Sequence, residues 1–466
     1  MKLTSIAAGF TLTAFTPLYA QQKPNVVFIV ADDLGYGDLS CYGQEKFQTP
    51  HIDRLALSGT RFTRSYSGTT VSAPSRASLM TGLHTGHTPV RGNKEMEPEG
   101  QYPLPAKTFT LFQLFKNAGY ATGAFGKWGL GQPGSTGDPN NQGVDVFFGY
   151  NCQRMAHNYY PDHLWHNQTK IELPENRNGQ FGTYAQDLIQ SKALEFIDKQ
   201  SKRSFFLYVP MVLPHAELVV PEDSIIRQLR GRFEEIPYKG VDSGPHFRKG
   251  GYMSQEYPHA THASMVKRID LYVGQIIDKL KETGVYENTL IIFTSDNGPH
   301  FEGGGDPDFF NSNGICRGYK RDLYEGGIRV PTIISWQKKV PAGRENSFPF
   351  AFWDYLPTFA QLLKQKAPTG TDGISVLPTI MGEKGQKKHD YFYFEFQEQG
   401  GRQAIIQGDW KLLHLDVRKG GRFELYNLAS DPSENHNLIA LFPLKATELK
   451  EMMKAARTDH PDWPLF

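Results

Sequence analysis

Four short apolar runs in this sequence each stop at a polar cluster, and this pattern limits the fold more than any other feature. The runs are Asn25–Val30, Tyr120–Phe125, Ser204–Val209 and Thr289–Thr294. They are rich in β-branched and aromatic residues and are bounded by turn residues, which predicts strands buried on both faces of a parallel sheet. Apolar residues at helical spacing lie between them, at 111–118 and 265–280. Alternating strands and helices predict a large α/β fold.

The residues that follow these runs have side chains suited to chemistry. Ligands of open α/β sheets bind beyond the carboxyl ends of the strands. The polar residues at those ends are Asp32, Asp33, Lys127, His215, Asp296 and Asn297. We therefore expect one site that is built from segments far apart in the chain.

The pattern changes after residue 370. Tyr391–Phe396, Gln403–Ile406 and Trp410–His414 predict antiparallel strands with Gly-rich turns, and 443–457 has helical spacing. We predict a domain at 21–370 followed by a smaller α+β domain at 371–466. Trp410 and Lys411 either close over a pocket of the first domain or pack within the second.

The first twenty residues predict a targeting signal rather than a part of the fold. A cationic start, the apolar stretch 6–15 and a small residue at Ala20 are typical of a secretory signal peptide. We expect an exported protein, periplasmic or secreted, whose mature chain begins near Gln21. No later stretch predicts a membrane span.

Composition excludes several classes of function. The chain has 50 Lys+Arg against 49 Asp+Glu, so no overall positive field attracts nucleic acid. Its three cysteines are too few for a disulfide framework and fit no zinc spacing. A single bridge such as Cys41–Cys152 is compatible with the sequence, but nothing selects it.

Two of the strand ends predict a metal site. The carboxylates and amide there supply hard oxygen ligands, which favours calcium or magnesium over zinc. Each segment alone is equally typical of a turn or a helix cap. Together, at two predicted strand ends, they favour the metal. The predicted ligands are Asp32, Asp33, Asp296 and Asn297.

The segment 71–82 predicts a helix with an anion site at its start. Pro74 fits the first helical turn and Gly82 lies near the end. Ser72 then lies at the N-terminus, where free N–H groups favour an anion, and Arg76 follows one turn later. In isolation the same pattern describes an N-cap serine and a surface arginine.

Here the chain resembles the sulfatase family, whose signature is Cys or Ser-x-Pro-Ser-Arg with a trailing Thr-Gly. The resemblance covers nearly the whole mature chain. Its further motifs are Ala31–Asp38, Thr49–Leu55, Gly126–Trp128, Pro214–Ala216, Ser295–Gly298, Lys320, Tyr324–Pro331, Glu424–Leu428 and Asp431–Glu434. It implies an alkaline-phosphatase-like fold: a large, mostly parallel sheet flanked by helices, with a smaller C-terminal domain that contains an antiparallel sheet.

The resemblance also implies roles for individual residues. Ser72 is the residue that sulfatases oxidise to formylglycine, the nucleophile, and it would join the four predicted ligands around a calcium ion. Arg76, Lys127 and Lys320 match the cations that bind sulfate. His215 matches the histidine near the leaving oxygen, so His215 or Lys320 would protonate the leaving group.

Two departures from the family pattern matter. Gly129 stands where the family commonly has a histidine that helps deprotonate the nucleophile; His157 or His87 would replace it, or Arg76 and the metal suffice. The signature residue is Ser, as in bacterial sulfatases matured by a radical formylglycine-generating enzyme.

The expected substrate is a sulfated sugar derived from a glycan. We expect His157, His300 and Lys320 to contact it, with the aromatic segment 150–165 either stacking on sugar or packing inside the protein. Two alternatives stay open: a phosphonate or phosphate ester hydrolase of the same superfamily, and a degenerate protein that binds sulfated glycans. The sequence does not fix the sugar, the sulfate position, exo or endo action, or the oligomeric state.

Overall fold

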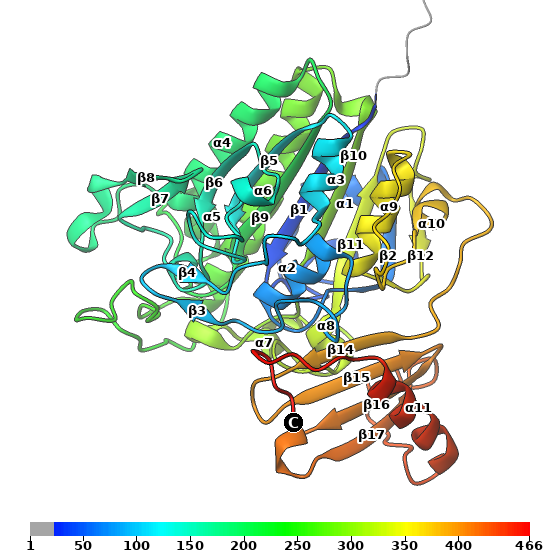
Figure 1. The fold of residues 1–466 in the computed structure, drawn as a ribbon. Coiled ribbons are helices and arrows are strands. Elements are labelled where there is room, and N and C mark those ends of the chain that lie inside the picture. The colour runs from blue at the N-terminus through cyan, green and yellow to red at the C-terminus, as the bar shows by residue number, and fades with distance from the viewer. Residues whose placement is uncertain (1–22) are drawn as a thin grey trace, which may run out of the picture.

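The computed structural model describes residues 23–466, so the predicted signal peptide lies outside the described residues. A large mixed sheet crosses the molecule (Figure 1). In spatial order its strands are β12 (Arg344–Asn346), β2 (Thr60–Tyr66), β11 (Arg329–Ser335), β10 (Thr289–Ser295), β1 (Asn25–Asp32), β9 (Phe205–Pro214), β5 (Ala121–Lys127), β6 (Val146–Tyr150), β7 (His163–His166) and β8 (Thr169–Glu172). The short β13 (Phe350–Ala351) also pairs with β2.

The centre of this sheet is parallel, as the apolar runs predict. β1 lies between β9 and β10 and is parallel to both, and β5 is parallel to β9 and β6. β11 runs antiparallel to β10, and β2 runs antiparallel to β11. All eight residues of β1 are buried, which explains why its sequence lacks polar alternation. The predicted fold class is confirmed.

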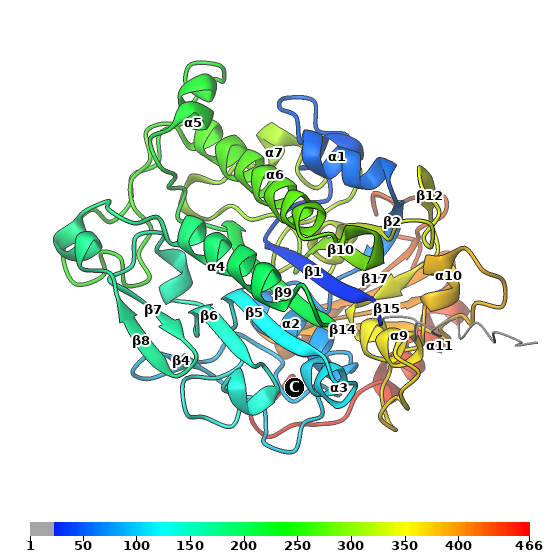
Figure 2. The ribbon, with the colours of Figure 1, turned by 90° about the horizontal axis from the view of Figure 1, so that it is seen from above.

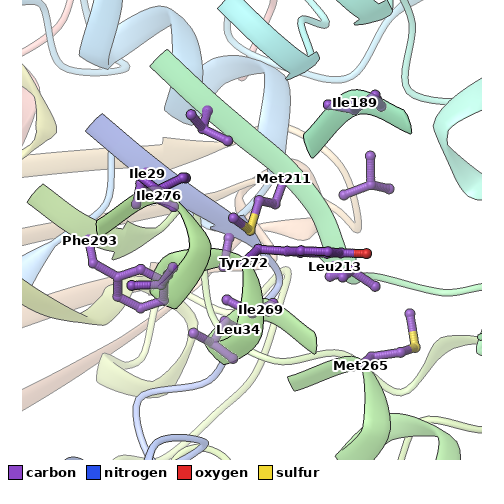
Figure 3. Close-up of a cluster of buried hydrophobic side chains, with 14 of the residues drawn as sticks. Ile29, Leu34, Ile189, Met211, Leu213, Met265, Ile269, Tyr272, Ile276 and Phe293 are labelled. Atoms are coloured by element: carbon purple, nitrogen blue, oxygen red, sulfur yellow. The ribbon is translucent and has the colours of Figure 1, made fainter. Parts of the chain in front are cut away.

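Helices cover both faces of the sheet (Figure 2). One face packs against α1 (Pro50–Leu57), α4 (Ala185–Gln200), α5 (Ser224–Leu229) and α6 (Pro258–Glu282). The other packs against α2 (Ser72–Thr81), α3 (Leu111–Asn117) and α9 (Tyr355–Leu362). Figure 3 shows part of the first core, where Ile29 of β1, Met211 of β9 and Phe293 of β10 surround Ile269 and Ile276 of α6. These two apolar layers hold the strand ends in register.

A second, antiparallel sheet follows near the C-terminus. It consists of β14 (Phe392–Phe396), β15 (Arg402–Gln407), β16 (Trp410–Leu415) and β17 (Arg422–Asn427). α11 (Pro443–Ala455) covers one face through Leu449 and Met453. The other face packs on Tyr66 and Trp353 of the first region. The C-terminal α+β domain is thus confirmed, while the boundary at residue 370 stays a prediction.

Shorter elements complete the described chain: the hairpin β3 (Glu95–Met96) and β4 (Gly100–Gln101), and the helices α7 (Pro307–Phe310), α8 (Glu325–Ile328) and α10 (Leu377–Met381). Cys41, Cys152 and Cys316 are all free thiols, so the Cys41–Cys152 bridge does not form. None of the helices within residues 23–466 is both long and apolar enough to cross a bilayer.

Lys411 joins the two sheets through a buried ion cluster. Its Nζ lies 2.9 Å from Glu325 Oε1 at the start of α8 and 2.9 Å from Glu434 Oε1. Glu434 also accepts a hydrogen bond from the backbone N–H of Glu325 at 2.6 Å. Lys411 is fully buried, so of the two roles considered for it, packing is the one observed.

We expect Lys411→Ala to lower the free energy of unfolding by about 3–5 kcal/mol, because it leaves two buried carboxylates without their cation. Denaturant unfolding measures this loss. Lys419→Ala, at an exposed lysine after the same strand, is the control and should stay within about 0.5 kcal/mol of wild type. Equal stability of the two variants would contradict the structural role of Lys411.

Candidate active site

The carboxyl ends of β1 and β10 bring the four predicted metal ligands together. Ala31 pairs with Ser295, so the residues after each strand face one another. The backbone N–H of Asp33 donates to Asp296 Oδ1 at 3.2 Å, and Asn297 Nδ2 donates to Asp33 Oδ1 at 2.7 Å. All of these side chains, with Asp32, are fully buried. Three carboxylates therefore share one interior site.

Ser72 enters this cluster as the first residue of α2. Its Oγ donates to Asp32 Oδ1 at 2.9 Å. Asn93 Oδ1 accepts from the next backbone N–H, that of Ala73, at 2.9 Å, which satisfies one free donor of the helix start. One turn later, Arg76 donates to Asp296 Oδ2 from Nε at 3.1 Å and from Nη2 at 2.8 Å. The helix thus brings both predicted side chains into the site.

Two lysines neutralise the remaining carboxylates. Lys127 is the last residue of β5, and its Nζ lies 2.5 Å from Asp32 Oδ2 and 3.5 Å from Ser72 Oγ. Lys320 lies on the loop between α7 and α8. Its Nζ donates to Asp33 Oδ2 at 2.8 Å. Each aspartate consequently has a close cation: Lys127 for Asp32, Lys320 for Asp33 and Arg76 for Asp296, and Arg76 also lies 3.7 Å from Asp32.

The charges in this cluster shift one another's pKa values. Burial alone would raise the pKa of Asp32, but Lys127 and the other cations hold it well below its usual range. Burial and the neighbouring charge of Asp32 raise the pKa of Asp296 to about 6. Burial lowers the pKa of Lys320, yet Asp33 and Glu302 outweigh it and raise the pKa overall. The protonation of each group therefore depends on its burial and on the charges of its neighbours.

His215 lies beside both Lys320 and Asp33, with its Nε2 3.4 Å from Asp33 Oδ2. The lysine donates to His215 Nε2 at 2.9 Å, while His215 Nδ1 donates to the carbonyl oxygen of Ala216 at 2.5 Å. Burial and the charge of Lys320 lower the pKa of His215 well below its ordinary value. At neutral pH the histidine is thus neutral and Lys320 is charged.

The other predicted histidines divide into two groups. The ring of His157 stacks on that of His215, with centroids 4.7 Å apart, and the ring of His300 lies 5.6 Å from it. His87 instead bonds to Asp372, with Nδ1 and Oδ1 2.8 Å apart. His157 and His300 therefore belong to the site's wall, whereas His87 contacts none of the other predicted residues.

The sequence does not predict two residues of this region, Glu302 and Gln153. Glu302 lies 3.3 Å from Lys320 Nζ and also forms an ion pair with Arg321. Gln153 fills the space beside Gly129: a Cβ at position 129 would lie 2.2 Å from Gln153 Nε2. Glu302 is followed by a glycine-rich segment, and Gln153 belongs to no motif. A single sequence therefore contains no pattern that marks either residue as part of the site.

The residues present fit a hard divalent cation. Asn297 Oδ1 is buried and has no hydrogen-bond partner within residues 23–466. Such an oxygen is normally satisfied, and a cation is one group that would do so. With the carboxylates of Asp32, Asp33 and Asp296 in the same buried cluster, the oxygen donors are of the kind that suits calcium or magnesium.

Comparisons with known proteins agree with the resemblance in sequence. Residues 24–365 match the family model described as Sulfatase, and residues 318–459 match that of the N-sulphoglucosamine sulphohydrolase C-terminal region. An N-acetylgalactosamine-6-O-sulfatase of Bacteroides thetaiotaomicron is 29% identical, over 94% of each chain. An arylsulfatase of Hemicentrotus pulcherrimus is 32% identical over 80% of this chain and 64% of its own length.

Solved structures share the whole architecture. The crystal structure of Ps i-CgsB in complex with k-i-k-neocarrahexaose superposes with a TM-score of 0.78 at 29% identity, covering 96% of this chain and 95% of that one. A phosphonate monoester hydrolase of Agrobacterium radiobacter has a TM-score of 0.66 at 21% identity, over 93% of this chain and 95% of its own. The second likeness concerns the fold alone.

We expect Gly129→Ala to lower the free energy of unfolding by about 1–3 kcal/mol, because its Cβ would overlap the Gln153 amide at a backbone φ of +74°. Gly119→Ala is the matched control, since φ there is +82° and a Cβ has no neighbour within 4 Å. Thermal unfolding of both variants separates overlap from backbone strain. If Gln153→Ala does not recover stability in the Gly129→Ala background, the overlap is not the cause.

Proposed function

The chain belongs to the sulfatase family and is a sulfuric ester hydrolase, and we propose that it removes sulfate from sulfated sugars through a formylglycine at position 72 and a calcium ion. The observation that supports this most directly is Ser72 at the start of α2, with its Oγ 2.9 Å from Asp32 and 3.5 Å from Lys127 Nζ. The side chain that would be modified already lies among carboxylates and cations.

A plain serine cannot expel sulfate by collapse to a carbonyl, whereas a hydrated aldehyde supplies one hydroxyl for attack and a second for this expulsion. Ser72 belongs to the family signature, and its serine form favours maturation by a radical formylglycine-generating enzyme. This proposal also needs export, which the predicted signal peptide at 1–20 would direct. The modification makes activity dependent on the cell that produces the protein.

Calcium would be held by Asp32, Asp33, Asp296 and Asn297 together with the modified residue 72. When bound, the ion would activate the nucleophile and offset negative charge on the sulfate. The chain's own contribution is to hold these oxygens in place: Arg76 fixes Asp296, Lys127 fixes Asp32 and Lys320 fixes Asp33. The unpartnered Asn297 Oδ1 supports this assignment.

The sulfate group would lie at the start of α2. Backbone N–H groups there favour an anion, and Arg76, Lys127 and Lys320 add positive charge where the reaction concentrates negative charge. His157 and His300 flank His215 and would contact the sugar. Since His157 contacts His215 and His87 does not, we assign the role of the missing histidine to His157.

Lys320 is the better proton donor for the leaving alkoxide. It is charged at neutral pH and donates to His215 Nε2, while His215 is neutral. In this arrangement His215 orients the lysine through this hydrogen bond, and Lys320 itself donates the proton to the leaving oxygen. Both residues lie near the leaving oxygen as expected from the sequence, and Lys320 is the source of the proton.

Two relatives at 29% identity support the proposed substrate class. One is named an N-acetylgalactosamine-6-O-sulfatase, and the other was solved in complex with k-i-k-neocarrahexaose. They support a glycan-derived sulfated sugar. Phosphonate hydrolysis is the second candidate, and rates on paired sulfate and phosphonate esters of one alcohol separate the two. A degenerate glycan-binding protein is disfavoured, because the metal-site residues and cations are all retained.

We expect the tryptic peptide that ends at Arg76 to be lighter by one pair of hydrogens at Ser72 when the protein is made beside its maturation enzyme. Mass spectrometry measures this. Ser72→Ala should lower kcat/KM on a sulfated sugar at least about 1,000-fold, because the nucleophile is lost. Ser78→Ala, a buried serine of the same helix, should keep its activity. Unmodified Ser72 in fully active protein would refute the mechanism.

Calcium should raise the melting temperature, and a chelator should abolish both the increase and the activity. At about 100 times its Kd the ion would stabilise the fold by about 2.7 kcal/mol. Asp296→Asn should remove this response, since it loses a ligand charge; Asp278→Asn, an exposed change on α6, should keep it. Calcium titration followed by calorimetry measures both. A full response in the Asp296→Asn variant would refute the site.

A further inference from the structure

A cleft of about 670 Å³ opens beside the single helical turn Met155–His157. It is formed by four segments of the chain: 98–99, 154–163, 176–179 and 245–249. Its acidic residues are Glu99 and Asp162, and basic residues outnumber them: Arg154, His163, Arg177, His246, Arg248 and Lys249. Its volume is in the range of pockets that bind small organic ligands.

Half of these basic groups have acidic partners. Arg154 Nη1 lies 3.4 Å from Glu97, His163 lies between Asp162 and Glu99, and Arg177 pairs with Glu172 at 2.8 Å. The other three, His246, Arg248 and Lys249, have no carboxylate within 4 Å among the described residues. The cleft therefore has surplus positive charge in a protein whose net charge is only +1.

Of the three, Arg248 is the strongest evidence that the cleft binds an anion. It is only 8% exposed, and its Nη1 donates to the carbonyl oxygen of Gln180 at 2.8 Å. Its Nε and Nη2 have no hydrogen-bond partner within residues 23–466. The guanidinium packs 4.4 Å from the ring centre of Phe181. Burial lowers the pKa of Arg248, and the charge of Glu217 offsets this effect only in part.

The cleft adjoins the active site through one short segment. Asn158 lines the cleft, and the preceding residue, His157, stacks on His215 at 4.7 Å. Lys320 contacts His215 in turn. A sugar whose sulfate lies beside Ser72 would meet His157, and the next ring of an oligosaccharide would continue past it toward Arg248 and Lys249.

We propose that this cleft is a subsite for a second anionic group of the substrate, a sulfate or a carboxylate on the ring next to the one that loses its sulfate. The inference rests on the proposed function and narrows it: the substrate is an oligosaccharide with at least two acidic groups. Charge-assisted hydrogen bonds are the interactions that such basic residues offer to sulfate and carboxylate.

The test compares three probes: a monosulfated monosaccharide, a disaccharide of the same sugar with a uronate as second ring, and one with a sulfated second ring. Wild type should have a kcat/KM at least about tenfold higher on one or both disaccharides than on the monosaccharide. Preference for one disaccharide identifies the carboxylate or the sulfate as the ligand. Equal values on all three probes would overturn the inference.

Lys249→Ala should lower the ratio of disaccharide to monosaccharide kcat/KM about tenfold, mainly through KM, whereas Lys366→Ala, at an exposed lysine outside the cleft, should leave the ratio intact. Binding of the disaccharide to Ser72→Ala protein, measured by calorimetry, should weaken with the same change. An unchanged ratio in Lys249→Ala would overturn the subsite. If the matured wild type hydrolyses none of the three probes and no aryl sulfate either, the proposed function itself is overturned.

Discussion

The structure depends on the mutual neutralisation of three buried carboxylates by three buried cations. Asp32, Asp33 and Asp296 come from strand ends, and each would be very unfavourable in the interior without its partner. The cations arrive from elsewhere: Arg76 from a helix, Lys127 from β5 and Lys320 from a loop. Folding of the sheet, of α2 and of that loop is therefore coupled electrostatically. The same cluster concentrates charge where an anion and a hard metal would bind.

The sequence predicts much of this because local chemistry and global topology agree. Buried parallel strands need apolar residues on both faces, so β1 and β10 are recognisable as runs and their ends as a site. The positions of Ser72 and Arg76 follow from helical spacing after Pro74. The antiparallel character of the C-terminal sheet follows equally from its short runs and Gly-rich turns.

What the sequence does not predict depends on contacts between distant segments. Glu302 belongs to no motif, and only the fold brings it to Lys320. For Lys411 the sequence leaves pocket closure and packing open, and only the fold shows it fully buried beside Glu325 and Glu434. The basic cleft unites four segments that have no common pattern. In each case the decisive quantity is burial or pairing, which a single sequence does not contain.

The contact between Gly129 and Gln153 has an evolutionary consequence. A Cβ at position 129 would lie 2.2 Å from Gln153 Nε2, so the end of the Gln153 side chain has to move before any side chain fits there. The backbone φ of +74° adds strain that no movement of Gln153 removes. A histidine placed at 129 in a descendant of this protein would therefore depend on the residue at 153, and the effects of changes at the two positions would not add.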